Sequence, residues 1–144
     1  MIVNSPAAMI SIKPKNEHSI QYSSRTVERA ERAMRCSPFK LQLFASMLQS
    51  SVSLNAIAGE SGVKQNYTNR PLSELAAENP LLWLIEVGIL RREVDGQGIT
   101  DSFRLTPLGR QLLEKWQSQG GSLPAPSLLD RLYNSLSRWL RWKF

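Results

Sequence analysis

The stretch EVGILRREVDGQGITDSFRLTPLGRQLLEKW, residues 86–116, contains the most specific structural signals in the chain. Strand-forming residues stand on either side of the segment DGQGIT, residues 95–100, whose Asp95, Gly96 and Gly98 are typical of a turn, so we expect a β-hairpin. Thr106 followed by Pro107 is a common start of a helix, because threonine caps free backbone N–H groups and proline needs no such partner. The stretch therefore predicts a hairpin that leads directly into a helix.

Upstream of this stretch, apolar residues at helical spacing predict several short helices and one strand. We expect a helix over 24–36, a second helix that Ser37 caps and that runs to about Gln49, a strand over 50–54, and a short helix over 54–62.

Two prolines frame the helix that precedes the hairpin. Pro71 is a favourable first helical residue, and we expect it to open a helical piece. Pro80 should kink or break this helix, because a proline inside a helix loses a hydrogen bond and clashes with the preceding turn. Trp83 and Trp116 stand among leucines at helical spacing and are expected in the core.

The order helix, strand, helix, helix, hairpin, helix resembles a winged helix-turn-helix domain, and residues 86–116 resemble the wing and next helix of bacterial regulators of the MarR and PadR type. The whole chain is also similar to an uncharacterised family of small cyanobacterial proteins. The resemblance to the regulators implies DNA binding and transcription regulation. The positions that carry it are Gly88, Leu90 to Arg92, the turn at Asp95 to Gly98, Leu105, Thr106 and Gly109.

The fold class that we expect is mainly α with a small β-hairpin, built as a winged-helix-like domain plus an extra N-terminal helix and a C-terminal amphipathic helix. Residues 1–23 have no periodicity and are interpreted as a flexible arm, and residues 24–117 as the domain. The Gly- and Pro-rich segment 118–126 is interpreted as a linker, and 127–144 as a basic amphipathic helix.

The formal net charge of +6 lies entirely in the two flanks of the chain. Residues 1–36 hold six Lys/Arg against three Asp/Glu, residues 37–118 eight against eight, and residues 119–144 four against one. The central domain is therefore neutral, which matters because cations supply most of the affinity for nucleic acid. The expected third helix, 72–87, contains no Lys or Arg but three glutamates.

Candidate nucleic-acid contacts are therefore restricted to a polar segment before the third helix and to the arginines of the wing. An ordinary solvated loop, or ordinary exposed strand positions, is the alternative for both groups. The candidates are Lys64, Gln65, Asn66, Tyr67, Thr68, Asn69, Arg70, Arg91, Arg92 and Arg104.

The C-terminal segment has apolar residues within one arc of a helix and polar residues opposite. Such a helix packs on the core, contacts a protein partner or a second copy of the chain, or lies on an anionic membrane surface. The residues that we expect to make the partner or membrane contact are Leu132, Leu136, Trp139, Leu140, Arg131, Arg138 and Arg141.

Residue usage argues against an enzyme. The chain has one cysteine, Cys36, and one histidine, His18, in the expected arm, and it has no glycine-rich phosphate loop and no clustered metal ligands. We therefore expect no catalytic residue, metal, cofactor or small-molecule substrate. A lone cysteine and the lack of a run of roughly 18 to 20 apolar residues favour a cytoplasmic protein.

Two hypotheses follow for the function. The first is a non-catalytic winged-helix regulator that binds DNA, with the basic flanks contacting phosphates. The second is a winged-helix-derived protein-interaction adaptor that docks through its C-terminal amphipathic helix, with membrane association as a variant.

Overall fold

The structure, a computed structural model, describes residues 21–143 of the chain and the side chains of residues 21–140. The expected arm over 1–23 lies outside the described residues except for its last three positions, and His18 lies outside them as well. The described chain is mainly helical with one small antiparallel sheet, which confirms the expected fold class. Its elements are α3 (Ser24–Cys36), α4 (Leu41–Gln49), β1 (Val52–Ser53), α5 (Leu54–Ile57), α6 (Gly59–Lys64), α7 (Glu74–Glu86), β2 (Leu90–Asp95), β3 (Gly98–Leu105), α8 (Pro107–Ser118) and α9 (Leu128–Lys143).

The predicted hairpin and the predicted strand form a three-stranded sheet in the order β1-β3-β2. Phe103 of β3 pairs with Val52 of β1 on one side and with Arg92 of β2 on the other. β2 ends at Asp95 and β3 already begins at Gly98, so the turn between the strands is very tight. Gly98 has a φ of 114°, which side chains rarely allow. The hairpin is therefore longer at its tip than the sequence pattern indicated.

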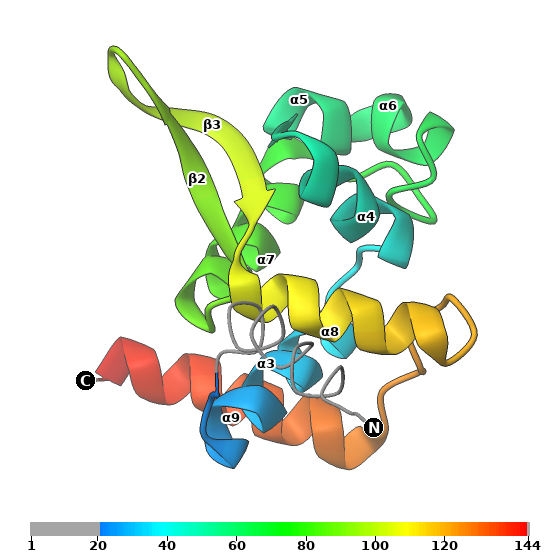
Figure 1. Ribbon diagram of the computed structural model, residues 1–144, viewed down its shortest axis with the longest axis vertical. Helices are drawn as coiled ribbons and strands as arrows, with labels where there is room; N and C mark the ends of the chain where they lie inside the picture. The colour runs from blue at the N-terminus through cyan, green and yellow to red at the C-terminus, as the bar shows by residue number, and fades with distance from the viewer. Residues whose placement is uncertain (1–20, 144) are drawn as a thin grey trace, which may run out of the picture.

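The hairpin and α9 lie at opposite ends of the molecule's long axis (Figure 1). α8 crosses between them, and α9 packs along α3. The tip of the hairpin projects beyond the helices, whereas α9 lies at the edge of the molecule (Figure 1).

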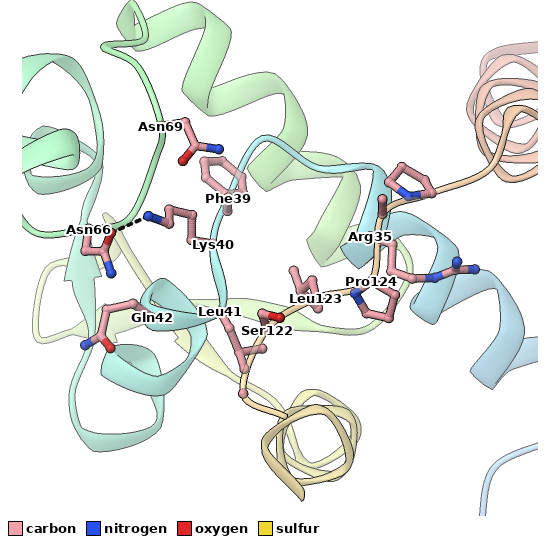
Figure 2. A pocket seen from close by; sticks show the side chains of 13 residues that line it. Arg35, Phe39, Lys40, Leu41, Gln42, Asn66, Asn69, Ser122, Leu123 and Pro124 are labelled. Carbon is pink, nitrogen blue, oxygen red and sulfur yellow. Dashed lines mark hydrogen bonds between the residues drawn. The ribbon is translucent and has the colours of Figure 1, made fainter. Parts of the chain in front are cut away.

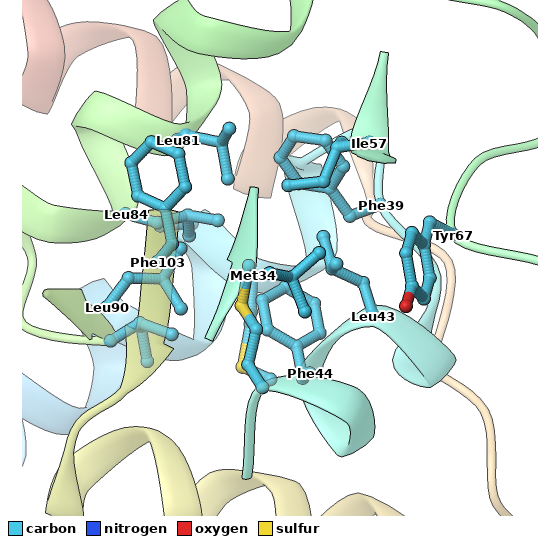
Figure 3. Close-up of a cluster of buried hydrophobic side chains, with 14 of the residues drawn as sticks. Met34, Phe39, Leu43, Phe44, Ile57, Tyr67, Leu81, Leu84, Leu90 and Phe103 are labelled. Atoms are coloured by element: carbon cyan, nitrogen blue, oxygen red, sulfur yellow. The ribbon is translucent and has the colours of Figure 1, made fainter. Parts of the chain in front are cut away.

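The core is built where α3, α4, α7 and the sheet meet. Figure 3 shows Met34, Phe44 and Phe103, from three different elements, converging on one cluster, and each is fully buried. Trp83 is 6% exposed and Trp116 is 5% exposed, which confirms their expected place in the core.

The predicted cap of α8 is confirmed. The hydroxyl of Thr106 accepts a hydrogen bond from the backbone N–H of Gly109 and donates to the carbonyl of Ile89. Pro107 follows as the first helical residue. This threonine therefore starts the helix and also ties it to the end of α7, where Gly88 provides a positive φ of 93°.

The start predicted for the second helix is wrong. α4 begins at Leu41 rather than at Pro38, because Ser37 serves the preceding helix instead: its hydroxyl donates to the carbonyl of Met34. Phe39 then forms an isolated bridge with Thr68, which holds the chain extended between the two helices.

The outcome at Pro71 also differs from expectation, and at Pro80 the helix is not broken. Pro71 does not open a helix, because the carbonyl of Leu72 accepts a hydrogen bond from Gly59 and keeps this segment extended, so α7 starts at Glu74 with Ser73 as its cap. This hydrogen bond from Gly59 also stabilises the interruption between α5 and α6, where the sequence predicted one helix over 54–62.

α7 continues through Pro80 without a break. Proline removes only one helical hydrogen bond, to the carbonyl of Ala76, and Ala76 is exposed to solvent, where water can replace the lost donor. Leu81 and Leu84 lie fully buried after the proline, so core packing holds this half of the helix in place.

Candidate functional site

The polar segment proposed for nucleic-acid contact divides into exposed and buried residues. Tyr67 and Thr68 are buried, with Tyr67 in the core cluster of Figure 3 and Thr68 bridged to Phe39. Their side chains are therefore not available to a ligand on the surface. The remaining candidates of this segment are exposed: Lys64, Gln65, Asn66, Asn69 and Arg70.

Of the three candidate arginines on the hairpin, only Arg91 is exposed, while Arg92 and Arg104 are half-buried. Arg92 is 3.1 Å from a carboxylate oxygen of Asp101 and 3.8 Å from one of Glu78, and its guanidinium also lies over the ring of Phe103. Arg104 pairs with Glu93 at 3.3 Å. Carboxylates on the same hairpin and on α7 thus neutralise two of the three cations.

The outer face of α7 is apolar and acidic. Leu75, Asn79, Leu82 and Glu86 are all exposed and fall on one stripe of the helix. Leu75 is 64% exposed and Leu82 is 40% exposed. From α6 to the end of the hairpin, residues 59–105, the chain holds five Lys/Arg and seven Asp/Glu, a net charge of −2. This part of the surface therefore carries little attraction for phosphate.

A pocket of about 370 Å³ lies between the start of α4, the loop after α6 and residues 121–126 (Figure 2). Two cations line it, but Arg35 pairs with Asp130 and Lys40 donates a hydrogen bond to the side chain of Asn66. Among the described residues that line it, no nucleophile stands with a base beside it. The sequence did not reveal this pocket because its three walls are far apart along the chain.

Cys36 is half-buried at the end of α3. Burial raises the pKa of its thiol, and the negative charge of Asp130 raises it further. A raised pKa keeps the sulfur protonated near neutral pH, and the thiol is a poor nucleophile. Residues 21–143 contain no group of three or more His, Cys, Asp or Glu side chains that could hold a metal ion.

The polar face of α9 is the one that packs against the domain. Asp130 lies 2.8 Å from the guanidinium of Arg35, and Asn134, which is buried, accepts a hydrogen bond of 2.9 Å from the indole Nε1 of Trp83. Arg138 lies over the same indole ring, 5.8 Å from its centroid. The helix is therefore held on α3 and α7 by polar contacts.

The apolar face of α9 consequently points away from the domain. Asn134 marks the buried side, and the apolar arc lies opposite to it on the helix. Packing on the core, one of three uses expected for this helix, thus occurs through the face opposite to the apolar one. The exposed apolar residues are Leu128, Leu129, Leu132, Tyr133, Leu136, Trp139 and Leu140, with exposed fractions between 44% and 86%.

The other expected contact residues of α9 have different surroundings. Arg131 is exposed and Arg138 is half-buried, while the side chain of Arg141 lies outside the described part of the chain. Among residues 21–143, no helix is both long and apolar enough to cross a bilayer.

The carboxylate of Asp130 anchors the first turn of α9. The backbone N–H of Ser127 donates to it, and so does the guanidinium of Arg35. These two hydrogen bonds, the first having the larger effect, lower the pKa of Asp130 below its ordinary value of 3.8. The carboxylate therefore remains charged, and the anchor intact, at neutral pH.

Asn134→Ala is expected to lower the free energy of unfolding by about 1 to 3 kcal/mol, because it leaves the buried indole N–H of Trp83 without an acceptor. Urea unfolding followed by tryptophan fluorescence measures the change. Ser135→Ala, at the neighbouring exposed position, is the control and should alter stability by less than about 0.5 kcal/mol. Equal losses in the two variants would show that the hydrogen bond does not hold α9.

Comparison with known proteins adds a family. No curated protein and no solved structure is similar enough to this chain to count as a match. A protein-family model described as Npun_F0494-like matches residues 20–138, from the start of α3 almost to the end of α9. This match fits the similarity to an uncharacterised family of small cyanobacterial proteins. Because it covers most of the chain, including α7 and most of α9, the chain belongs to the Npun_F0494-like family.

Proposed function

We propose that this protein acts by binding and not by catalysis, as a cytoplasmic, winged-helix-derived adaptor for another protein. The order of its elements from α4 to α8, with β1 pairing to β3 and β3 to β2, is the order expected from the resemblance to winged-helix regulators of the MarR and PadR type. In such domains the helix before the hairpin is the one that reads DNA. In this chain that helix is α7.

The outer face of α7 is the observation that carries the proposal. DNA-reading helices present cations and amides to phosphates and base edges. α7 presents Leu75 and Leu82 instead, with Asn79 between them and Glu86 beyond. An apolar stripe with a polar surround is suited to a protein surface, where apolar area is buried on contact.

The hairpin, like α7, is better suited to contact a protein than DNA. Val94 and Ile99 pair across the two strands near the tip and are 60% and 74% exposed. Arg92 and Arg104, the cations that a DNA-binding wing would direct at phosphates, are engaged by carboxylates. A partner would thus meet two small apolar areas, one on α7 and one on the hairpin.

DNA binding stays a prediction and is the second candidate. The chain order favours it, as do the exposed cations Lys64, Arg70 and Arg91. Because Asp and Glu outnumber Lys and Arg over residues 59–105, any DNA contact would have to draw on the basic flanks.

Titration of labelled random duplex DNA at low salt separates the two candidates. The full chain is expected to show no binding at micromolar concentration even at low salt, where non-specific binders bind more tightly than the roughly 10⁻⁴ to 10⁻⁶ M typical of them at physiological salt. Binding that weakens steeply as salt rises would contradict the adaptor proposal and support the DNA-binding one.

A photocrosslinking residue tests for the protein partner directly. The photocrosslinking residue replaces Leu82, and the cells that make the protein are illuminated. We expect a discrete adduct with another protein. The same residue at Glu114, exposed on α8, is the control and should yield none. Identical adducts at both positions, or none at Leu82, would argue against docking through α7.

A further inference from the structure

The most extensive exposed apolar surface of the described chain is the outer face of α9, and the function proposed above does not use it. Seven large apolar side chains share this face, among them Leu132 at 55% and Leu136 at 44% exposure. Exposed apolar surface of this extent on one helix marks a contact site. The helix cannot rotate to bury this face, because Asn134 and Asp130 bind the domain from the opposite side.

Cations border this apolar face on the side of α3. Arg25, Arg29 and Arg32 are spaced so that they form one row along that helix. The guanidinium of Arg32 lies 5.4 Å from the centroid of the Tyr133 ring, which places the row beside the apolar arc of α9. Arg25 and Arg29 are exposed, so the row faces solvent next to the apolar residues.

A cation also borders the other side of the face. Arg131 is exposed, and at 100° per residue it lies next to Leu128, across the apolar arc from Tyr133. The apolar stripe thus has the arginines of α3 beside one edge and Arg131 near the other. α9 itself holds one acidic side chain, Asp130, and Arg35 already neutralises it.

We propose that this face, formed by the apolar side of α9 with the arginines of α3 and Arg131, binds the surface of an anionic lipid bilayer. A helix lying in the plane of a membrane inserts leucine and aromatic side chains between the headgroups and keeps its cations at the level of the phosphates. The flanking arginines are positioned for that second role, and each adds attraction to anionic lipid.

The positive charge around the apolar face of α9 argues against a second copy of the chain binding there. An antiparallel pair of α9 helices would bring the arginine rows of two molecules together, in a chain whose two flanks each carry a net charge of +3. Like charges placed side by side oppose association. The headgroups of an anionic bilayer are negative, so they complement the arginines that lie beside the apolar stripe.

This binding mode leaves the hairpin part of the proposed protein-contact surface free. α9 and the tip of the hairpin lie at opposite ends of the molecule (Figure 1), so a molecule seated on a membrane through α9 presents its hairpin away from the lipid. The proposal nevertheless stands on α9 and α3 alone, and it does not depend on a partner for α7.

Flotation of the full chain with vesicles tests the proposal. One set contains phosphatidylglycerol and phosphatidylcholine in equal parts, and the other contains phosphatidylcholine only. We expect the protein to float with the anionic vesicles and to remain in solution with the neutral ones. Rising salt should release it, since the charge contribution is screened.

Leu132→Glu combined with Leu136→Glu is the decisive variant. It should weaken binding to the anionic vesicles more than about tenfold, because two side chains that insert into the bilayer become charged. Leu75→Glu combined with Leu82→Glu, two leucines of similar exposure on α7, is the matched control and should bind like the unaltered chain. All four leucines are exposed, so the variants should keep the urea midpoint of the unaltered protein.

Single Arg25→Ala, Arg29→Ala and Arg131→Ala variants test the charged border. Each should weaken binding about fivefold, the equivalent of about 1 kcal/mol per cation near an anionic surface. Equal binding to neutral and anionic vesicles would overturn the proposal, as would loss of binding in the α7 control alone. A dimer in light scattering that the α9 variant dissociates, with no vesicle binding, would overturn it in favour of a second copy.

Discussion

Gly62→Ala is expected to lower the free energy of unfolding by about 3 kcal/mol, at the upper end of the usual cost of overpacking. Gly62 is buried in α6, and a Cβ at this position would lie 1.9 Å from the carbonyl oxygen of Ile57 and 2.9 Å from its carbon. Both atoms belong to the backbone, so no side-chain rotation relieves the clash. α5 and α6 would have to separate.

The same residue also organises the loop that follows α6. The carbonyl of Gly62 accepts hydrogen bonds from the backbone N–H groups of Tyr67 and Thr68. A shift of α6 would disturb these bonds, and with them the bridge between Thr68 and Phe39. A loss of about 3 kcal/mol is a large part of the 5 to 15 kcal/mol that holds a typical domain folded.

Urea unfolding followed by circular dichroism measures this effect. Gly96→Ala is the matched control, because a Cβ there would meet no atom within 4 Å and the residue has no positive φ. The control should change stability by less than about 0.5 kcal/mol. If the Gly62 variant unfolds at the same urea concentration as the control, α5 and α6 do not pack as closely as described.

Phe103→Ala is expected to cost about 3 to 5 kcal/mol, the usual range for removing a buried phenylalanine. Phe103 is fully buried on the central strand β3, between Val52 of β1 and Arg92 of β2. Its removal would leave a cavity in the core cluster of Figure 3 and withdraw the ring over which Arg92 lies. A sheet of three short strands has few other contacts to compensate.

The comparison within the same strand is Ile99→Ala. Ile99 is 74% exposed near the hairpin tip, so its truncation should change stability by less than about 0.5 kcal/mol. Thermal or urea unfolding of both variants checks the difference. Similar losses at the two positions would mean that β3 does not direct Phe103 into the core.

Both proposed contact surfaces depend on the interior that these two variants would disrupt. Glu78 of α7 reaches Arg92 of the hairpin, so the two areas of the adaptor surface are joined by an ion pair. The indole N–H of Trp83, also on α7, donates a hydrogen bond to the side chain of Asn134 on α9. α7 is therefore an element that positions the hairpin and α9 relative to each other.

Local signals in the sequence were sufficient for the hairpin and for the start of α8. The DGQG turn and the Thr106 cap act within a few residues, so their effect does not depend on distant parts of the chain. The same holds for the amphipathic pattern of α9. The misplaced start of α4 and the uninterrupted α7 had another cause, since contacts from Met34, from Thr68 and from the core outweighed the local preferences of Ser37 and Pro80.

For the candidate site residues, too, local properties could be read from the sequence and tertiary contacts decided the rest. The sequence distinguished polar from apolar positions in the segment 64–70, but Tyr67 and Thr68 are buried because Gly62 and Phe39 bond this loop to the body of the domain. Likewise, the hairpin arginines were visible in the sequence, whereas the pairing of Arg92 with Asp101 and Glu78 required the folded chain.

The sequence by itself determined that α9 is amphipathic, because the spacing of its leucines is a property of one helix. Only the tertiary structure decided which face points outward. A buried indole N–H on Trp83 and the half-buried guanidinium of Arg35 both require acceptors, and Asn134 and Asp130 supply them from the polar side of the helix. The cost of leaving these buried polar groups unpaired orients the helix, and the leucines are thereby turned toward solvent.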